Sequence, residues 1–249
     1  ARKDLKKLRA VLRLLRGTLP EPACREEMRR YRDAGRALSA TRDAEVRLAA
    51  LEGLGECAVE LPADAFEAWR AILARDREAA ANAARDLPAI EEARELIEAG
   101  LAGIEGWRLV GDSWDLIEGG LRRIYRRGRR AMRAAEREPS EANLHDWRKR
   151  AKDLWYTLRL LQGAWPAVLG ALAGEAHRLS ELLGDHHDLA LLREDLQQRR
   201  LGEEETRALE GAIDGRQEEL AAEAFTLGHL LYAERPQDFS RRMRSYWSG

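Results

Sequence analysis

The stretch LHDWRKRAKDLWYTLRLL, residues 144–161, indicates which kind of fold this sequence can form. Its apolar residues recur every three or four positions, at Trp147, Ala151, Leu154, Leu158 and Leu161. That spacing is typical of one face of an α-helix, which turns once in about 3.6 residues. The other side of the stretch is basic. We therefore expect an amphipathic helix that buries one face and carries a row of cations on the other.

The rest of the 249-residue chain repeats this pattern. Ala, Leu, Arg and Glu predominate, β-branched residues are sparse, and no run alternates apolar and polar residues as a strand would. We predict an all-α protein. The expected helices are 2–16, 22–40, 43–54, 64–85 and 88–101 in the first half, and 112–136, 140–163, 166–183, 187–199 and 203–231 in the second.

Net charge is only −1, which by itself gives no reason to expect an anionic ligand. The charge is, however, unevenly distributed along the chain. Residues 1–43 and 119–160 carry net charges of +7 and +8, whereas residues 44–118 and 161–249 carry −10 and −6. Cations concentrated in two stretches indicate a basic patch rather than an even, solubilising coat.

The two basic stretches are related in sequence. RKDLKKLRAVLRLLRG begins at Arg2 and RKRAKDLWYTLRLLQG begins at Arg148, so an offset of 146 aligns them. A second landmark follows in each half, Arg42-Asp43 in the first and His187-Asp188 in the second. Two landmarks with similar spacing favour a tandem duplication. We predict one helical bundle over residues 1–105 and a second over 106–235, related by a pseudo-twofold around a basic central cleft, and a loosely attached tail at 236–249.

Four of the expected helices carry a row of basic residues along one face. The rows are Arg2, Lys6, Arg9, Arg13 and Arg16; Arg25, Arg29, Arg32 and Arg36; Arg122, Arg126, Arg129 and Arg133; and His145, Arg148, Lys149, Lys152 and Arg159, with Tyr156 beside the last. Like charges four residues apart destabilise a helix by roughly a few tenths of a kcal/mol per pair. A single row is usually a solvated face or a partner for acids on another helix. Four rows, two of them related by duplication, favour a surface that binds an anionic ligand.

The residue types in these rows favour a strand of phosphate groups over one small molecule. The planar guanidinium group of Arg matches phosphate oxygens in pairs, and Lys adds a compact point charge. A protein that reads nucleic-acid bases would add stacking aromatic residues and amide side chains on the same faces. The aromatic candidates found there are Tyr156 and Trp155. The pattern therefore indicates recognition of charge rather than of bases.

Together these motifs resemble the CHAD family, the conserved histidine α-helical domain, across nearly the whole chain. The segments that carry the resemblance are GLRRIYRRGRRAM (120–132), LHDWRKRAKDLWYTLRLL (144–161), LGDHHDLALL (183–192), RKDLKKLRAVLRLLR (2–16) and LSATRDAEV (38–46). The resemblance implies two helical bundles whose basic residues line a shared cleft for inorganic polyphosphate. It implies no catalytic activity, and no cofactor or metal is expected.

The resemblance also implies which residues bind the ligand. His145 matches the signature histidine of the family, and its first-half equivalent would precede Ala1, as would the equivalent of helix 112–136. The expected ligand-binding set is Arg2, Lys3, Lys6, Arg9, Arg13, Arg29, Arg32, Arg36, Arg122, Arg126, Arg129, Arg130, Arg133, His145, Arg148, Lys149, Lys152, Tyr156 and Arg159.

An enzymatic alternative comes from the histidines. His145, His187 and Asp188, with Asp214 as a later acid, could imitate the metal ligands of an HD-type phosphohydrolase. The duplicated half has Arg42 at the position of His187, and arginine is not a metal ligand. We interpret Asp188, like Asp43, as the N-cap of a helix instead. The sequence also has no E-x-E-x-K pattern, so we expect no triphosphate tunnel hydrolase.

A helical scaffold that binds nucleic acid, or binds protein through the acidic segment 203–223, remains a further alternative. Cys24 and Cys57 form neither a metal-type pair nor a disulfide framework, which favours a reducing compartment. No apolar stretch approaches the ~18 residues that cross a bilayer, so we expect no membrane partner. We expect a cytoplasmic protein, and polyphosphate granules would be a location consistent with its ligand.

Overall fold

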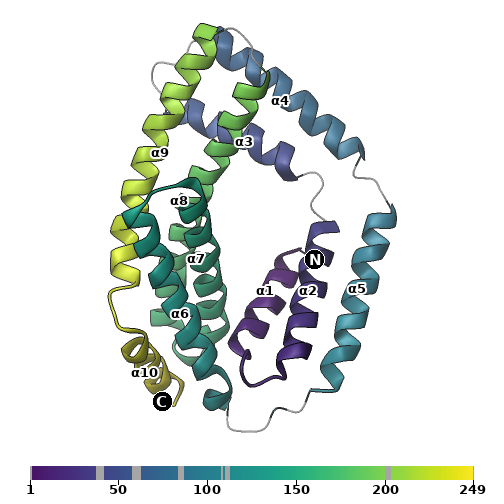
Figure 1. The fold of residues 1–249 in the computed structure, drawn as a ribbon, viewed down its shortest axis with the longest axis vertical. Coiled ribbons are helices and arrows are strands. Elements are labelled where there is room, and N and C mark those ends of the chain that lie inside the picture. The colour runs from purple at the N-terminus through teal and green to yellow at the C-terminus, as the bar shows by residue number, and fades with distance from the viewer. Residues whose placement is uncertain are drawn as a thin grey trace. The chain divides into compact units, whose positions relative to one another are not determined.

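The structure is a computed structural model, and it describes residues 2–37, 42–57, 63–83, 87–107, 109, 113–199 and 203–248 (Figure 1). All regular elements in these ranges are helical, which confirms the all-α prediction. They are α1 (Arg2–Leu14), α2 (Glu21–Ala37), α3 (Arg42–Cys57), α4 (Ala63–Ala83), α5 (Leu87–Glu105), α6 (Ser113–Arg137), α7 (Glu141–Leu161), the 3₁₀ turn η1 (Gln162–Ala164), α8 (Pro166–Arg199), α9 (Glu203–Leu231) and α10 (Pro236–Trp247).

Contacts between helices divide the chain into two compact units. The first unit contains Ala1–Leu38, Leu87–Ser180 and Leu227–Gly249, and the second contains Ser39–Asp86 and Glu181–Thr226. These boundaries differ from the sequence halves 1–105 and 106–235, because α1 of the first half packs directly on α6 and α7 of the second. The pseudo-twofold between the halves and a cleft between them stay predictions.

In the first unit, α1 and α2 form a helical hairpin that packs beside α5 (Figure 1). Leu5 and Leu12 of α1 bury their side chains against Cys24 and Tyr31 of α2. Gly17 has a φ of 105°, a left-handed conformation that ends α1 and that glycine adopts without strain. The chain can therefore turn tightly between the two helices.

Helices α6 and α7 pack together in the same unit, and both contact α1. A side chain at Gly120 would clash with the backbone carbonyl of Leu14, so glycine is what lets α6 approach the end of α1. Ser140 caps α7, since its hydroxyl accepts a hydrogen bond from the Asn143 N–H. Trp147 and Leu154 bury the apolar face of α7 that the sequence predicts.

The prediction of a loosely attached tail at 236–249 is wrong. Residues 236–247 form α10, which packs on α6. Phe239 and Met243, four residues apart, are buried, and the Phe239 ring stacks on Tyr125 with 4.0 Å between ring centroids. Burial of Phe239 and Met243 therefore docks this segment although it is rich in arginine.

In the second unit, α3 packs against α4, and parts of α8 and α9 complete it. The sequence predicted separate helices at 166–183 and 187–199, but α8 runs without a break from Pro166 to Arg199. Gly184 inside a helix costs only about 1 kcal/mol relative to alanine, and burial of Leu183 and Leu189 on either side outweighs that cost. Asp188 therefore lies inside α8 and does not cap it, while Asp43 lies in the first turn of α3.

Candidate functional site

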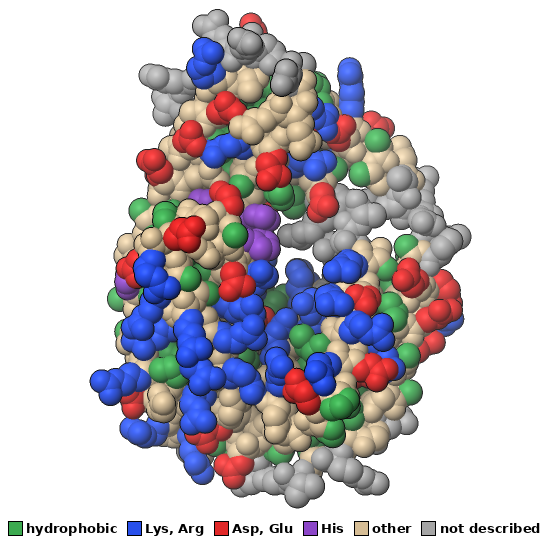
Figure 2. Space-filling model, viewed as in Figure 1, with side chains coloured by type: hydrophobic (Ala, Val, Ile, Leu, Met, Phe, Trp, Pro, Cys, Tyr) green, Lys and Arg blue, Asp and Glu red, His purple; other side chains and the backbone are tan. Residues whose placement is uncertain are grey.

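A cavity of about 480 Å³ lies in the first unit among α1, α2, α6 and α7. Arginine side chains dominate its walls, and Leu12, Cys24 and Met28 give it an apolar floor. We call it the arginine groove, and its arginines are Arg9, Arg13, Arg16, Arg25, Arg29, Arg32, Arg127 and Arg150. Figure 2 shows Lys and Arg side chains gathered on the face that these helices form. No carboxylate is among the described residues that line the groove.

Helical spacing explains how the groove forms. Arg25, Arg29 and Arg32 recur at four and three residues, so they follow one side of α2, while Cys24 and Tyr31 turn inward. On α1, Leu5 and Leu12 point into the core. The hydrophobic effect thus folds the hairpin, and the same folding brings its basic faces together.

A second cavity, of about 600 Å³, lies where the turn between α1 and α2 meets α6. We call it the hairpin pocket, and its lining is Arg16, Gly17, Glu21, Arg123, Arg126, Arg127 and Arg130. Arg123 donates a hydrogen bond to the carbonyl of Arg16, which ties α6 to the turn. Arg16 and Arg127 line both cavities, so the arginine groove and the hairpin pocket adjoin one another.

The crowded cations of this surface perturb one another. Burial, and then the neighbouring charges of Arg16 and Arg126, lower the pKa of Arg123. The pKa of Arg127 is lowered by burial and by Arg150. Arginine stays protonated at neutral pH despite such shifts. The lowered pKa values therefore indicate that the charged side chains are held there at a cost in free energy. The surface holds unfavourable positive charge that an anionic ligand would relieve.

Asp153 of α7 is a carboxylate that lies among these arginines. Its oxygens form ion pairs with Nε of Arg13 at 3.2 Å and with Nη1 of Arg150 at 3.4 Å. Burial raises the pKa of Asp153, and the charges of Arg13, Arg150, Arg127 and Arg9 oppose that rise. Asp153 therefore joins basic residues of α1 and α7, and it also feels the charge of Arg127 on α6.

The structure assigns different surroundings to the residues predicted from sequence. Arg9, Arg13, Arg29 and Arg32 line the arginine groove, and Arg126 and Arg130 line the hairpin pocket. Twelve others lie on the same four helices and line neither cavity: Lys3, Lys6, Arg36, Arg122, Arg129, Arg133, His145, Arg148, Lys149, Lys152, Tyr156 and Arg159. The side chain of Arg2 lies outside the described residues.

Several of these twelve already have partners within the protein. Arg129 donates from Nε to the carbonyl of Tyr232 at 3.1 Å. Lys149 pairs with Asp146 at 3.3 Å, and the Arg159 guanidinium lies 5.9 Å from the centre of the Trp155 ring. Tyr156 is 8 % exposed, so its ring is mainly a packing element.

The predicted ligand-binding set leaves out Arg16 and Arg25 of this surface, although the predicted basic rows include both. Arg123, Arg127, Arg150 and Asp153 appear in neither prediction. Arg123, Arg127 and Arg130 are spaced by four and three residues, a second basic row beside the one that was recognised on α6. Asp153 lies three residues after Arg150, a spacing that permits an ion pair on one helix face. Both signals were present in the sequence.

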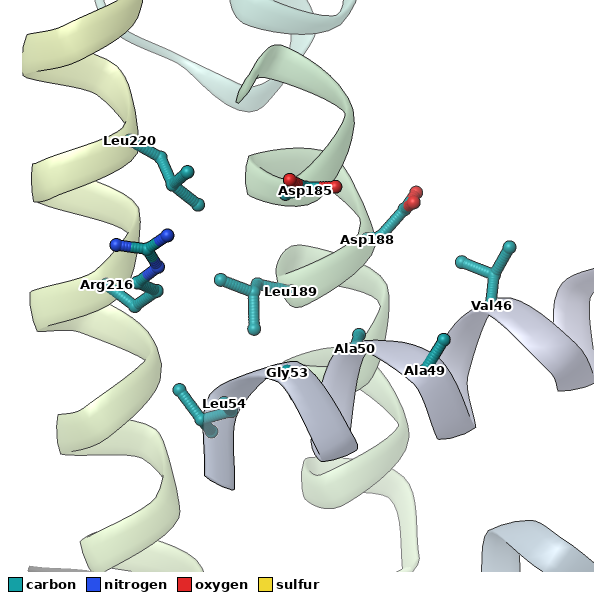
Figure 3. Close-up of a pocket in the computed structure, with 10 residues that line it drawn as sticks. All are labelled: Val46, Ala49, Ala50, Gly53, Leu54, Asp185, Asp188, Leu189, Arg216 and Leu220. Carbon is teal, nitrogen blue, oxygen red and sulfur yellow. The ribbon is translucent and has the colours of Figure 1, made fainter. Parts of the chain in front are cut away.

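The second unit contains a cavity of different character, of about 250 Å³ (Figure 3). Mostly apolar or small residues of α3, α8 and α9 line it, with Asp185, Asp188 and Arg216 as the charged members. Arg216 forms an ion pair with Glu219 at 2.7 Å, and Asp185 is among the groups that raise the pKa of Arg216. The positive charge in this cavity is therefore balanced locally.

The residues proposed for a metal-dependent phosphohydrolase are divided between the units. His145 belongs to the first unit, whereas His187, Asp188 and Asp214 belong to the second. Asp214 forms an ion pair with Arg193. Within the described ranges, no group of three or more His, Cys, Asp or Glu side chains comes together as a metal site would require.

Fold and site together define an all-helical protein with an arginine-lined surface. The chain belongs to the CHAD family, because the family model of the CHAD domain matches residues 1–197. No curated protein matches the chain significantly. None of the described helices is both long enough and apolar enough to cross a membrane.

Proposed function

We propose that this protein binds inorganic polyphosphate and does not transform it. The observation that carries the proposal is the arginine groove, where eight arginines line one cavity and no carboxylate is among its described lining residues. Membership of the CHAD family supports the same ligand class. The pseudo-twofold arrangement of two bundles around one basic cleft, which the duplicated sequence predicts, belongs to this proposal.

The extent of the basic surface favours a linear ligand over a single phosphate. The arginine groove and the hairpin pocket share Arg16 and Arg127, so a chain of phosphates that fills one can continue into the other. Each guanidinium group offers five N–H donors in a fixed plane, which suits repeated pairs of phosphate oxygens. Single-stranded nucleic acid would also match the charge, but stacking aromatic side chains are not among the described lining residues of either cavity.

A binding role without catalysis fits the chemistry of these residues. Arginine neither ligates a metal nor exchanges a proton near neutral pH, so a surface built from it favours holding an anion over cleaving it. The two cysteines are free thiols, which supports the proposed cytoplasmic location.

A direct binding measurement tests the proposal. The whole chain is titrated with polyphosphates of several defined lengths, with DNA and RNA of equal charge as competitors and with a divalent-metal chelator present. We expect affinity to increase with chain length, to survive chelation, and to be only weakly reduced by nucleic acid. Release of orthophosphate that depends on a divalent metal would contradict the proposal and support the phosphohydrolase alternative.

A matched variant pair separates the groove from general surface charge. Arg29 of α2 lines the groove, whereas Arg94 of α5 is exposed and forms ion pairs with Glu91 and Glu98. Arg29→Ala should weaken binding by about 1–3 kcal/mol because it removes a charge-assisted contact. Arg94→Ala should leave the Kd nearly unchanged. Equal losses would mean diffuse attraction without a defined site.

A further inference from the structure

Two carboxylates, Glu21 and Asp153, lie among the arginines of the first unit, and they differ in position. Glu21 lines the hairpin pocket, its side chain is 43 % exposed, and it pairs with Arg16 at 2.8 Å. Asp153 lines neither cavity, and its side chain is 13 % exposed. Glu21 is therefore open to solvent and to ligand, whereas Asp153 is largely shielded from solvent.

Asp153 contacts the arginines without using up their donors. It binds Nε of Arg13 and Nη1 of Arg150, and Nη2 of Arg150 binds Asp146 at 3.0 Å. Five N–H groups on each guanidinium leave donors on Arg13 for a ligand in the groove. A buried carboxylate that holds basic side chains of different helices fixes their direction before any anion arrives.

We propose that Asp153 is a positioning residue for polyanion binding, which holds the guanidinium groups of Arg13 and Arg150 in place in the arginine groove. This inference rests on the proposed function. Long side chains lose conformational freedom when they bind a ligand, and that loss is smaller where an ion pair has already ordered them. Without Asp153, the neighbouring arginines would also repel one another and turn away from the groove.

The proposal and simple charge counting predict opposite changes in polyanion affinity when Asp153 loses its charge. If charge alone mattered, removing either acid would strengthen binding of a polyanion. Positioning by Asp153 predicts that Asp153→Asn weakens binding, whereas Glu21→Gln strengthens it because Glu21 competes with the ligand for Arg16. The two variants change net charge equally and therefore control for each other.

The test measures the Kd for polyphosphate of one defined length at several salt concentrations, using the whole chain. We expect the Kd of Asp153→Asn to rise about tenfold, as loss of one charge-assisted contact would produce, and the dependence of log K on log salt to become shallower because fewer phosphates are neutralised. We expect Glu21→Gln to lower the Kd about twofold, the size typical of an exposed ion pair.

A second variant decides the outcome if Asp153→Asn does not fold. Asp146 binds the same Arg150 and is 43 % exposed, so Asp146→Asn should fold. Unlike Glu21, Asp146 lines neither cavity and does not compete with the ligand there, so its loss should still weaken binding by about twofold. Tighter binding by Asp153→Asn, or by Asp146→Asn where the first variant is unfolded, overturns the positioning role. Failure of the unaltered protein to bind polyphosphate would instead overturn the proposed function itself.

Discussion

The two units of this protein use arginine in different ways. In the second unit, Arg193 pairs with Asp214, Arg199 with Asp76 and Asp195, and Arg216 with Glu219. In the arginine groove of the first unit, Arg13, Arg16, Arg32 and Arg150 pair with four carboxylates, which are Asp153, Glu21, Asp33 and Asp146. Arg9, Arg25, Arg29 and Arg127 line the same cavity, and no acid is among its described lining residues. The groove therefore gathers more arginines in one cavity than its paired carboxylates can neutralise, whereas the three arginines named in the second unit each have an acidic partner. Unneutralised cations on a folded surface indicate a ligand, while paired ones contribute mainly to local structure.

The largest effect is expected when the two arginines that both cavities share are removed, which tests the proposed difference between the two units. The double variant Arg16→Ala and Arg127→Ala should weaken polyphosphate binding by roughly 2–6 kcal/mol, since each arginine can supply a charge-assisted contact worth about 1–3 kcal/mol. The matched double variant Arg193→Ala and Arg216→Ala in the second unit should change the Kd little. Calorimetric titration measures both, and similar losses in the two doubles would end the distinction between the units.

Thermal unfolding provides a second test, because a polyanion that relieves repulsion among the arginines should stabilise the folded protein. A ligand that binds only the folded protein adds about 2.7 kcal/mol of stability at a hundredfold excess over its Kd. We expect the Tm to rise with long-chain polyphosphate, to rise less with pyrophosphate, and to lose the gain in high salt, because counterion release weakens binding. A Tm that rises equally with both anions would mean that no extended site is engaged.

Single substitutions within the first unit compare a residue that lines a cavity with residues of the basic row on α7. Arg126 lines the hairpin pocket, whereas Arg148, Lys152 and Arg159 belong to the row on α7 that lines neither cavity. The sequence predicts that alanine at each position weakens polyphosphate binding by about 1–3 kcal/mol. Titration of the four variants, with Arg235→Ala as control, would show whether the ligand extends along α7. Losses confined to Arg126 would limit the site to the two cavities.

The smallest effect concerns the pH dependence of stability in the second unit. Burial, and then the charge of Arg193, lowers the pKa of His186 from its ordinary value of 6.5. The unfolded chain therefore binds a proton at His186 more readily than the folded chain, so the free energy of unfolding should fall as pH drops through 6.5. His186→Asn should flatten this dependence between pH 7.5 and 5.5 in denaturant titrations. An identical slope in both proteins would rule His186 out as its source.

Much of the fold could be predicted because helical periodicity is a local property. Leu5, Leu12, Trp147 and Leu154 recur at helical spacing, and all four are buried in the structure. The errors came where a local signal was overridden by packing. The interpretation of Asp188 as an N-cap implied a break that the buried leucines of α8 prevent, and the basic α10 docks through Phe239.

The candidate site likewise has features that follow from local sequence and features that depend on tertiary packing. The sequence by itself determined that basic rows follow α1, α2, α6 and α7, because residues three and four apart share a helix face whatever surrounds them. Which rows meet was decided by tertiary structure, since α1 packs on α6 and α7 only when leucines distant in sequence are buried together. The same packing brings Arg13 of α1 to Asp153 of α7, a contact that no spacing along one helix could specify. Charge placement is thus local information, whereas burial and pairing of those charges are properties of the folded chain.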